Sequence, residues 1–284
     1  MVELPAAIVI LATGTASSAL FTRRGRGRGF DAPPGPEHDP AGPRVPALGG
    51  LSIGVAATAG LAFHRGLDIA GLPLLLGAWV FLVLGVLDDR LDLPVVARVT
   101  LELGAALVVA ALWGAALDAP IVARALLVPW ILVVVNGLNF LDGSDGLAAC
   151  VVVGGLAAAL PFPGVGRIPE IFVLATLPFL FFNLRRPAKL YLGDGGARCL
   201  GVVLALVTAT SAHYGDLARS TGPVLLPLAE LITTILRRAA SGSSLIHPDR
   251  DHLPDRLLAW GAPVRGLALG GGVLAFVLAL LLRV

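Results

Sequence analysis

The chain has 284 residues, of which 56% are hydrophobic and only 14% charged, and its mean hydropathy is +0.87. This balance lies far outside that of soluble domains and indicates a membrane protein. The net charge of +2 says little about nucleic acid, and no nucleic-acid partner is expected. Cys150 and Cys199 lie in apolar runs without disulfide or metal-ligand spacing, so neither kind of cysteine framework is expected.

Apolar runs, cut at charged or Pro/Gly-rich breaks, predict ten membrane helices. The fold class is therefore all-α, a polytopic integral membrane protein with a single transmembrane helical domain over residues 1–284. In chain order the predicted helices span 2–21, 47–63, 69–87, 96–117, 121–140, 146–162, 169–184, 197–214, 222–237 and 265–282.

Two longer connections separate these helices. Residues 22–46, rich in Gly, Pro and Arg, are predicted to form a flexible cytoplasmic loop. Residues 238–264 are predicted to form a second cytoplasmic loop. The start carries Glu3, and its arginines follow the apolar run, so we expect a retained helix instead of a cleaved signal peptide.

The basic residues predict the orientation. Sixteen of the 21 lie in the odd-numbered loops and only four in the even-numbered loops. By the positive-inside rule the odd loops face the cytoplasm and both termini lie outside. We expect a multi-pass protein of the inner (plasma) membrane, with its active site on the cytoplasmic face.

The odd loops also collect the acids of this apolar chain. A carboxylate at the bilayer centre costs about 2.5–3.5 kcal/mol, and acids at helix ends in such a chain are rarely without function. Carboxylates on one face need a cation, and hard oxygen ligands suit Mg²⁺, which favours phosphoryl chemistry. The principal acids are Asp88, Asp89, Asp142, Asp145 and Asp194.

Single polar residues have ordinary interpretations. Asp92 is readily explained as a solvated interfacial charge, and Asn136 or Asn139 alone would be explained as a helix end. The segment 136–146 differs, because two amides and two acids gather around two glycines where an apolar helix ends. Such a cluster indicates a functional site.

With these motifs the chain resembles the polyprenyl-phosphate N-acetylhexosamine-1-phosphate transferases (glycosyltransferase family 4), which include the phospho-N-acetylmuramoyl-pentapeptide transferases. The resemblance runs from Arg44 to Gly261. Its motifs are the pair Asp88-Asp89, the Asn-x-x-Asn-x-x-Asp-Gly-x-Asp-Gly-Leu signature from Asn136 to Leu147, the aromatic-x-Gly-Asp element from Tyr191 to Asp194, and the loop from Pro248 to Leu253. The loop resembles the N-acetylglucosamine branch of the family.

The resemblance implies a Mg²⁺-dependent enzyme, with Mn²⁺ as an alternative ion. It would transfer N-acetylhexosamine 1-phosphate, preferably GlcNAc-1-phosphate, from a UDP-sugar to a polyprenyl phosphate. UMP is released, and the lipid-linked product serves cell-wall or surface polysaccharide synthesis, such as that of lipopolysaccharide. Catalysis is assigned to Asp88 and Asp89, and the metal to Asp194 and Asp89.

The same resemblance implies a nucleotide-sugar site. Arg44 and Asp145 are assigned to the uracil, with Tyr191 stacking on the ring. The remaining members of the set are Asn136, Asn139, Asp142, Asn183, Arg250 and His252. Small residues such as Gly154, Gly155 and 270–272 permit close helix contact, and a homodimer is the oligomer considered.

The chain departs from the family pattern at several positions. Arg44 stands where the family usually has lysine, a lysine expected near Thr100 is missing while Glu102 follows, and Ala197 replaces a serine. Pro254 and Asp255 stand where histidines are common. These departures leave open a catalytically retuned or inactive paralogue.

Two rival classes are less consistent with the sequence. A phosphatidyltransferase acting on CDP-alcohols requires charges along the helix after Asp145, yet residues 147–160 carry none. A membrane transporter requires ionisable residues near the middle of its helices. Only Glu102 and Glu230 approach that description, and both are expected within about two turns of the cytoplasmic end.

Overall fold

The structure is a computed structural model of the whole chain. It is almost entirely helical, with one small antiparallel sheet in which β1 (Asp31–Ala32) pairs with β2 (Val45–Pro46). The residues that it describes are 2–27, 29–32, 43–63, 71–162, 164–213, 220–242 and 252–282.

Helices lie at all ten of the predicted segments, most with ends within a few residues of those expected. They are α1 (Leu4–Arg24), α2 (Gly49–Phe63), α3 (Gly71–Leu91), α4 (Val95–Ala116), α5 (Ile121–Leu141), α6 (Leu147–Ala159), α7 (Ile168–Asn183), α8 (Gly193–His213), α10 (Leu225–Ala240) and α12 (Val264–Leu281). A 3-10 turn, η1 (Gly222–Val224), precedes α10, and a short helix, α11 (Leu253–Ala259), precedes α12.

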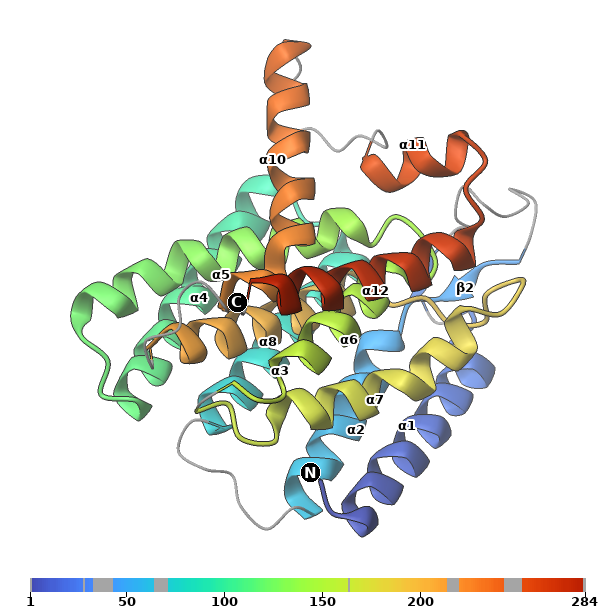
Figure 1. Cartoon of the computed structure of the whole chain (residues 1–284). Helices are drawn as coiled ribbons and strands as arrows, with labels where there is room; N and C mark the ends of the chain where they lie inside the picture. Colours follow the sequence, from blue (N-terminus) through green and yellow to red (C-terminus); the bar gives the residue numbers. More distant parts are fainter. Residues whose placement is uncertain are drawn as a thin grey trace.

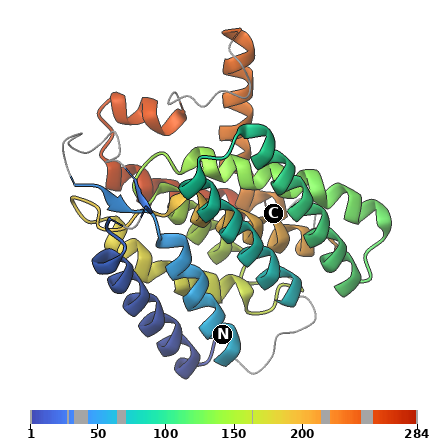
Figure 2. The same ribbon diagram turned by 180° about the vertical axis from the view of Figure 1, so that it is seen from behind.

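Helix α8 forms the centre of the bundle. It packs against α2, α3, α5 and α6, and 89% of its apolar span is buried, against 22% for α12 at the periphery. Figures 1 and 2 show α8 enclosed by the other helices from both sides. A residue on α8 is therefore held by neighbours on nearly every face.

Two helix ends differ from the prediction in a way that matters for the site. Helix α3 continues to Leu91 instead of ending at residue 87, and α8 begins at Gly193 instead of residue 197. Asp88 and Asp89 therefore lie in the last turn of α3, and Asp194 lies in the first turn of α8. A carboxylate in a first helical turn is stabilised by the helix dipole. These acids are thus fixed on helices instead of being carried by loops.

Glycine allows α3 and α8 to approach closely at this end. A Cβ atom built on Gly85 would overlap the backbone of Gly195, so no other residue fits at this crossing without moving a helix. The crossing lies one turn from Asp88 on α3 and next to Asp194 on α8. Backbone contact between the two helices thus determines how far apart the acids are.

The outer surface of the bundle is apolar. Leu107 and Val108 on α4 and Val273 on α12 are each more than half exposed. Large exposed apolar surfaces of this kind suit contact with lipid. Among the described residues, six helices are long and apolar enough to cross a membrane, namely α1, α3, α4, α5, α8 and α12. The chain is therefore a multi-pass membrane protein.

The region after α8 contains more helix than expected. Helix α10 runs three residues past its predicted end at 237 and projects beyond the bundle, with α11 beside it (Figure 1). The described part of the predicted loop 238–264 thus includes the end of α10 and all of α11. Residues 33–42 of the predicted loop 22–46, and residues 243–251, lie outside the described residues.

Two of the glycines considered for a homodimer contact each other within one chain. Gly154 on α6 faces Gly272 on α12, and a Cβ atom on Gly154 would overlap the Gly272 carbonyl. Gly154 and Gly272 therefore serve the packing of α6 against α12.

Candidate active site

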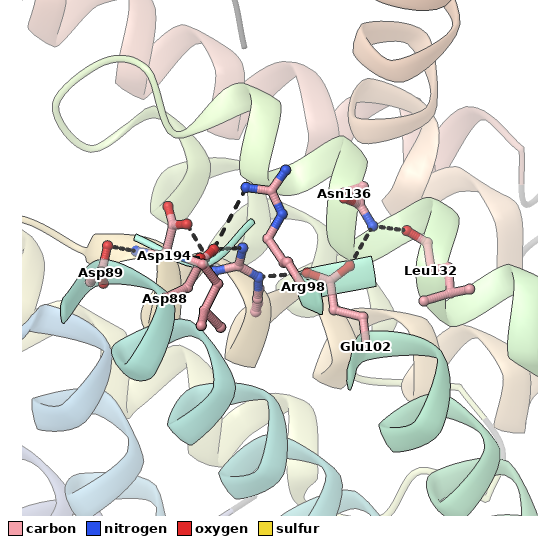
Figure 3. Close-up of polar contacts among 9 residues, drawn as sticks. Asp88, Asp89, Arg98, Glu102, Leu132, Asn136 and Asp194 are labelled. Atoms are coloured by element: carbon pink, nitrogen blue, oxygen red, sulfur yellow. Dashed lines mark hydrogen bonds and ion pairs between the residues drawn. The ribbon is translucent and has the colours of Figure 1, made fainter. Parts of the chain in front are cut away.

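Three aspartates meet where α3 ends and α8 begins, and we call Asp88, Asp89 and Asp194 the acid cluster. The backbone N–H of Asp194 donates to Asp89 Oδ1 over 3.3 Å (Figure 3). The side chain of Asp88 is 7% exposed and that of Asp194 35%, while Asp89 is exposed. Asp89 and Asp194 are therefore the members that a soluble ligand can reach.

A buried arginine contacts two members of this cluster. Arg198 lies one turn after Asp194 on α8, and its side chain is 2% exposed. Its Nη1 donates to Asp194 Oδ2 at 2.9 Å, and its Nη2 donates to Asp88 Oδ2 at 2.6 Å. Its Nε donates to Glu102 Oε1 on α4 at 2.8 Å. A buried guanidinium requires such partners, because an uncompensated charge inside a protein is strongly unfavourable.

Asp88 is the most enclosed of the three acids. Besides Arg198, it faces Arg98, whose Nη1 lies 3.6 Å from Asp88 Oδ2. The backbone N–H of Leu93, in the turn that follows α3, donates to Asp88 Oδ1 at 3.2 Å. Asp88 thus fixes the connection between α3 and α4 as well as contributing charge.

Asn136 is connected to the cluster through Glu102. Its Nδ2 donates to Glu102 Oε2 at 3.2 Å and to Leu132 O at 2.9 Å, as drawn in Figure 3. A carboxamide has two N–H donors. Both are engaged here, so only the side-chain oxygen of Asn136 is available to a ligand in this arrangement.

A glycine lies beside the acid cluster at a position where a larger residue would not fit. Gly193 has φ +74°, and a Cβ atom there would lie 2.6 Å from Ala47 O and 3.0 Å from Asp89 Oδ2. Among the described residues, no group of three or more His, Cys, Asp or Glu side chains is placed to hold a metal ion. Mg²⁺, however, commonly takes one or two carboxylates together with phosphate and water oxygens. Asp89, which is exposed, and Asp194 fit that smaller donor set.

The turn between α5 and α6 carries the next predicted residues. The N–H of Asp142 donates to Asn139 O at 3.1 Å, and Asp145 is buried at 6% exposure. Gly143 faces the Asp255 side chain of α11. This turn therefore lies at the same end of the bundle as the acid cluster, next to α11.

Asn183, at the end of α7, is 2% exposed and supports a neighbouring turn. Its Nδ2 donates to Leu190 O at 2.9 Å, while its Oδ1 is buried and has no hydrogen-bond partner among the described residues. That oxygen lies 3.3 Å from where a Cβ of Gly146 would be. The side chain is thus enclosed between α6 and α7.

Backbone hydrogen bonds place the segment that carries Arg44 next to Tyr191. The N–H of Tyr191 donates to Pro46 O at 2.9 Å, and the N–H of Gly49 donates to Tyr191 O at 2.8 Å. Arg44 is exposed and lies two residues before Pro46. The two predicted ligands thus share one edge of the site, next to the start of α2.

His252 forms a second polar group on α10 and α11, and we call Glu230 and His252 the histidine pair. His252 Nδ1 lies 3.0 Å from Glu230 Oε1, and the Thr234 hydroxyl donates to the same oxygen at 3.1 Å. The ring of Phe140, on α5, lies 4.9 Å from the imidazole ring. Arg250, the other basic residue predicted for this loop, lies outside the described residues.

The departures Pro254 and Asp255 have a local role in this structure. Pro254 occupies the first turn of α11, where its missing N–H is not needed. Asp255 Oδ2 accepts the N–H of His252 at 3.1 Å, forming a capping box. Together they start the helix that His252 precedes.

Arg198 and the pairing of Glu230 with His252 were not predicted, because Arg198 stands in no family motif and Glu230 was interpreted only as an acid inside an apolar helix. One signal was present. Arg198 stands four residues after Asp194 inside an apolar helix, and Glu102 is an acid inside another. Opposite charges in apolar helices indicate partners.

Residues 72–212 match a family model described as glycosyl transferase family 4. The chain is 30% identical over 277 residues to the decaprenyl-phosphate N-acetylglucosaminephosphotransferase of Mycobacterium tuberculosis (strain ATCC 25618 / H37Rv), covering 79% of this chain and 68% of the relative. It is 29% identical over 240 residues to the probable undecaprenyl-phosphate N-acetylglucosaminyl 1-phosphate transferase of Bacillus subtilis (strain 168), covering 76% and 66%.

It is also 26% identical over 248 residues to the undecaprenyl-phosphate alpha-N-acetylglucosaminyl 1-phosphate transferase of Escherichia coli (strain K12), covering 76% of this chain and 66% of the relative. The chain thus spans about two thirds of the length of these relatives.

Proposed function

We propose a specific reaction for this chain, which belongs to glycosyl transferase family 4. It transfers N-acetylglucosamine 1-phosphate from UDP-N-acetylglucosamine to a polyprenyl phosphate. The names of the relatives support the polyprenyl phosphate acceptor and the N-acetylglucosamine phosphate group. The observation that carries the proposal is the acid cluster, because three carboxylates on two rigid helix ends suit the transfer of a phosphoryl group.

The reaction exchanges one phosphorus–oxygen bond for another. An oxygen of the polyprenyl phosphate attacks the β-phosphorus, which carries the sugar, and forms the new bond. The bond from that phosphorus to the bridging oxygen breaks, and the bridging oxygen leaves with UMP. The product is a lipid-linked sugar pyrophosphate. Nothing is oxidised or reduced.

In this proposal Asp89 and Asp194 hold Mg²⁺, or Mn²⁺ as an alternative. The ion, when bound, neutralises the charge of the two phosphates, an effect worth several kcal/mol. Asp88 orients the acceptor phosphate or accepts its proton. The ion pairs of Asp88 with Arg98 and Arg198 favour orientation as the larger part of this role.

The nucleotide-sugar site is proposed beside this cluster. Arg44 and Asp145 hold the uracil, with Tyr191 stacking on its ring, and Asn139 and Asp142 hold the ribose and pyrophosphate. Asn136 contributes its side-chain oxygen, since both of its N–H groups are engaged. Asn183, which is buried, supports the turn before Tyr191. His252 and Arg250 hold the sugar or its phosphate.

We further propose that all ten main helices cross the membrane, with both termini outside and the acid cluster on the cytoplasmic side of the plasma membrane. The distribution of arginines supports this orientation. Single cysteines at Ser241 and Asp118 test it, since a membrane-impermeant thiol reagent should label only position 118 in intact cells. Labelling of position 241 instead would reverse the orientation. A homodimer would need surfaces other than Gly154 and Gly272.

The reaction is tested with purified protein in detergent, supplied with Mg²⁺, a polyprenyl phosphate and a panel of UDP-sugars. We expect UMP release that requires the lipid acceptor and is fastest with UDP-N-acetylglucosamine. No UMP from any sugar, with Asp88→Asn behaving like the parent, would favour an inactive paralogue. Uptake of a solute into proteoliposomes without a lipid acceptor would favour a transporter.

A further inference from the structure

Arg198 differs from the other polar residues of the site in its burial. It is 2% exposed, yet it bonds to acids from three helices, namely Asp88 on α3, Glu102 on α4 and Asp194 on α8. A side chain so enclosed cannot contact a substrate. Any effect of Arg198 on transfer therefore acts through the carboxylates that it holds.

The shape of the guanidinium determines what it can hold. Its nitrogens lie in one plane in a rigid fork. Two of them reach Asp88 and Asp194, at 2.6 and 2.9 Å, while Nε points back to Glu102 at 2.8 Å. Glu102 is itself fixed by Asn136. The fork is thus anchored on one side and bridges two reactive acids on the other.

Glu102 also determines the net charge of the group that Arg198 forms with Asp88 and Asp194. Two carboxylates close together repel each other, and a single guanidinium between them offsets that repulsion. Arg198 alone would also reduce the negative charge of Asp88 and Asp194. Glu102, buried at 2% exposure, accepts the Nε–H at the remaining edge of the guanidinium and restores negative charge to the group. The acids can then be held together and still attract a cation.

We propose that Arg198 is a positioning residue, which, anchored by Glu102, fixes the carboxylates of Asp88 and Asp194 relative to each other. This inference rests on the proposed function, in which those two acids serve the acceptor phosphate and the metal. The contrasting explanation is that Arg198 only compensates the buried charge of Glu102.

A double variant separates the two explanations. Arg198→Gln with Glu102→Gln removes one charge of each sign, so the buried pair no longer needs compensation. If Arg198 positions the acids, the double variant stays folded but loses about 30-fold or more in kcat, with the KM for UDP-N-acetylglucosamine changed by less than about threefold. Parent-level kcat in a folded double variant would show that Arg198 only balances Glu102.

A second readout does not depend on turnover. Mn²⁺ binding to the protein, followed by electron paramagnetic resonance, should weaken about tenfold in the double variant, because Asp194 is no longer fixed. Unchanged Mn²⁺ binding would overturn the inference. If the parent itself releases no UMP, the proposed function fails, while this measurement still decides whether Arg198 positions Asp194.

If the double variant does not fold, Arg198→Lys provides a second test. Lysine keeps the charge but has no planar fork, so it cannot bridge both acids while bonding to Glu102. We expect kcat to fall about tenfold with little change in melting temperature, and parent-level kcat would overturn the inference. The matched control is Arg167→Gln with Glu170→Gln, a 3.9 Å pair at the start of α7, which should leave kcat unchanged.

Discussion

The acid cluster and the histidine pair lie at the same end of the bundle but on different supports. The acid cluster joins the end of α3 to the start of α8, the most buried of the apolar spans at 89%. The histidine pair joins α10 to α11, and α10 projects beyond the bundle (Figure 1). In the proposed reaction the transferred phosphate needs fixed geometry, while sugar recognition tolerates adjustment. The proposal thus places the chemistry on the better-packed support.

The largest effect should follow from a change in the acid cluster. Asp194→Asn keeps the size of the side chain but removes the charge that the proposed metal and Arg198 require. We expect kcat to fall about 1,000-fold or more, which corresponds to about 4 kcal/mol. UMP release measures it. The exposed Asp118→Asn, at the far end of α4, is the control, and equal rates in the two variants would remove Asp194 from the reaction.

A smaller effect should follow when the support of the cluster is moved. Gly85→Ala adds a Cβ atom that overlaps Gly195, so α3 and α8 must separate. We expect about 1–3 kcal/mol of destabilisation and about a tenfold or larger loss of kcat. Gly104→Ala, which adds a Cβ into open space on α4, should be neutral or slightly stabilising. Thermal unfolding and UMP release measure these effects. If Gly85→Ala and Gly104→Ala gave the same stability and the same rate, the α3–α8 crossing would be unimportant.

The histidine pair should be less sensitive. Glu230→Gln retains an oxygen for Thr234 and His252 but removes the charge that strengthens the bond to the imidazole. We expect kcat/KM for the UDP-sugar to fall about tenfold, or about 1.4 kcal/mol, chiefly through KM. Steady-state kinetics, with Glu170→Gln as the control, measure the effect. A loss confined to kcat would place Glu230 with the acid cluster instead.

The smallest effect is expected for Arg98→Gln. Arg98 is 33% exposed and lies 3.6 Å from Asp88, so its ion pair is partly screened by solvent. Such pairs contribute about 0–1 kcal/mol. We expect less than about a fivefold change in kcat, far below the effect of changing Arg198. An equal loss of kcat in the Arg98 and Arg198 variants would contradict the distinction between the partly exposed and the buried arginine.

Hydrophobic segmentation predicted the helices well because most are long apolar runs interrupted by charge, Pro or Gly. It failed at the ends of α3 and α8, where Asp88 and Asp194 belong to helices although they are charged. Intrahelical bonds and the partner Arg198 offset the unfavourable placement of those acids. Contacts of this kind depend on residues far apart in the sequence.

The same limit explains which site residues were predicted. Asp89 and Asp194 stand in motifs, so local pattern was enough to predict a role for them. Glu102 and Glu230 were interpreted as acids inside apolar helices, the pattern expected of a transporter, and Glu102 also as a departure from the family pattern. The structure pairs them with Arg198 and His252. Whether such an acid lines a transport path or forms a buried ion pair depends on its partner on another helix. The spacing of residues in the sequence does not reveal that partner.

We propose that the sugar phosphate is transferred from the nucleotide to the lipid phosphate at the acid cluster. The most direct test measures, by mass spectrometry, the lipid-linked sugar pyrophosphate formed from UDP-N-acetylglucosamine and a polyprenyl phosphate by the parent and by Asp89→Asn. The parent should form this product, and the folded variant should form it about 1,000-fold more slowly or worse. Product formation at the parent rate by Asp89→Asn would contradict the account.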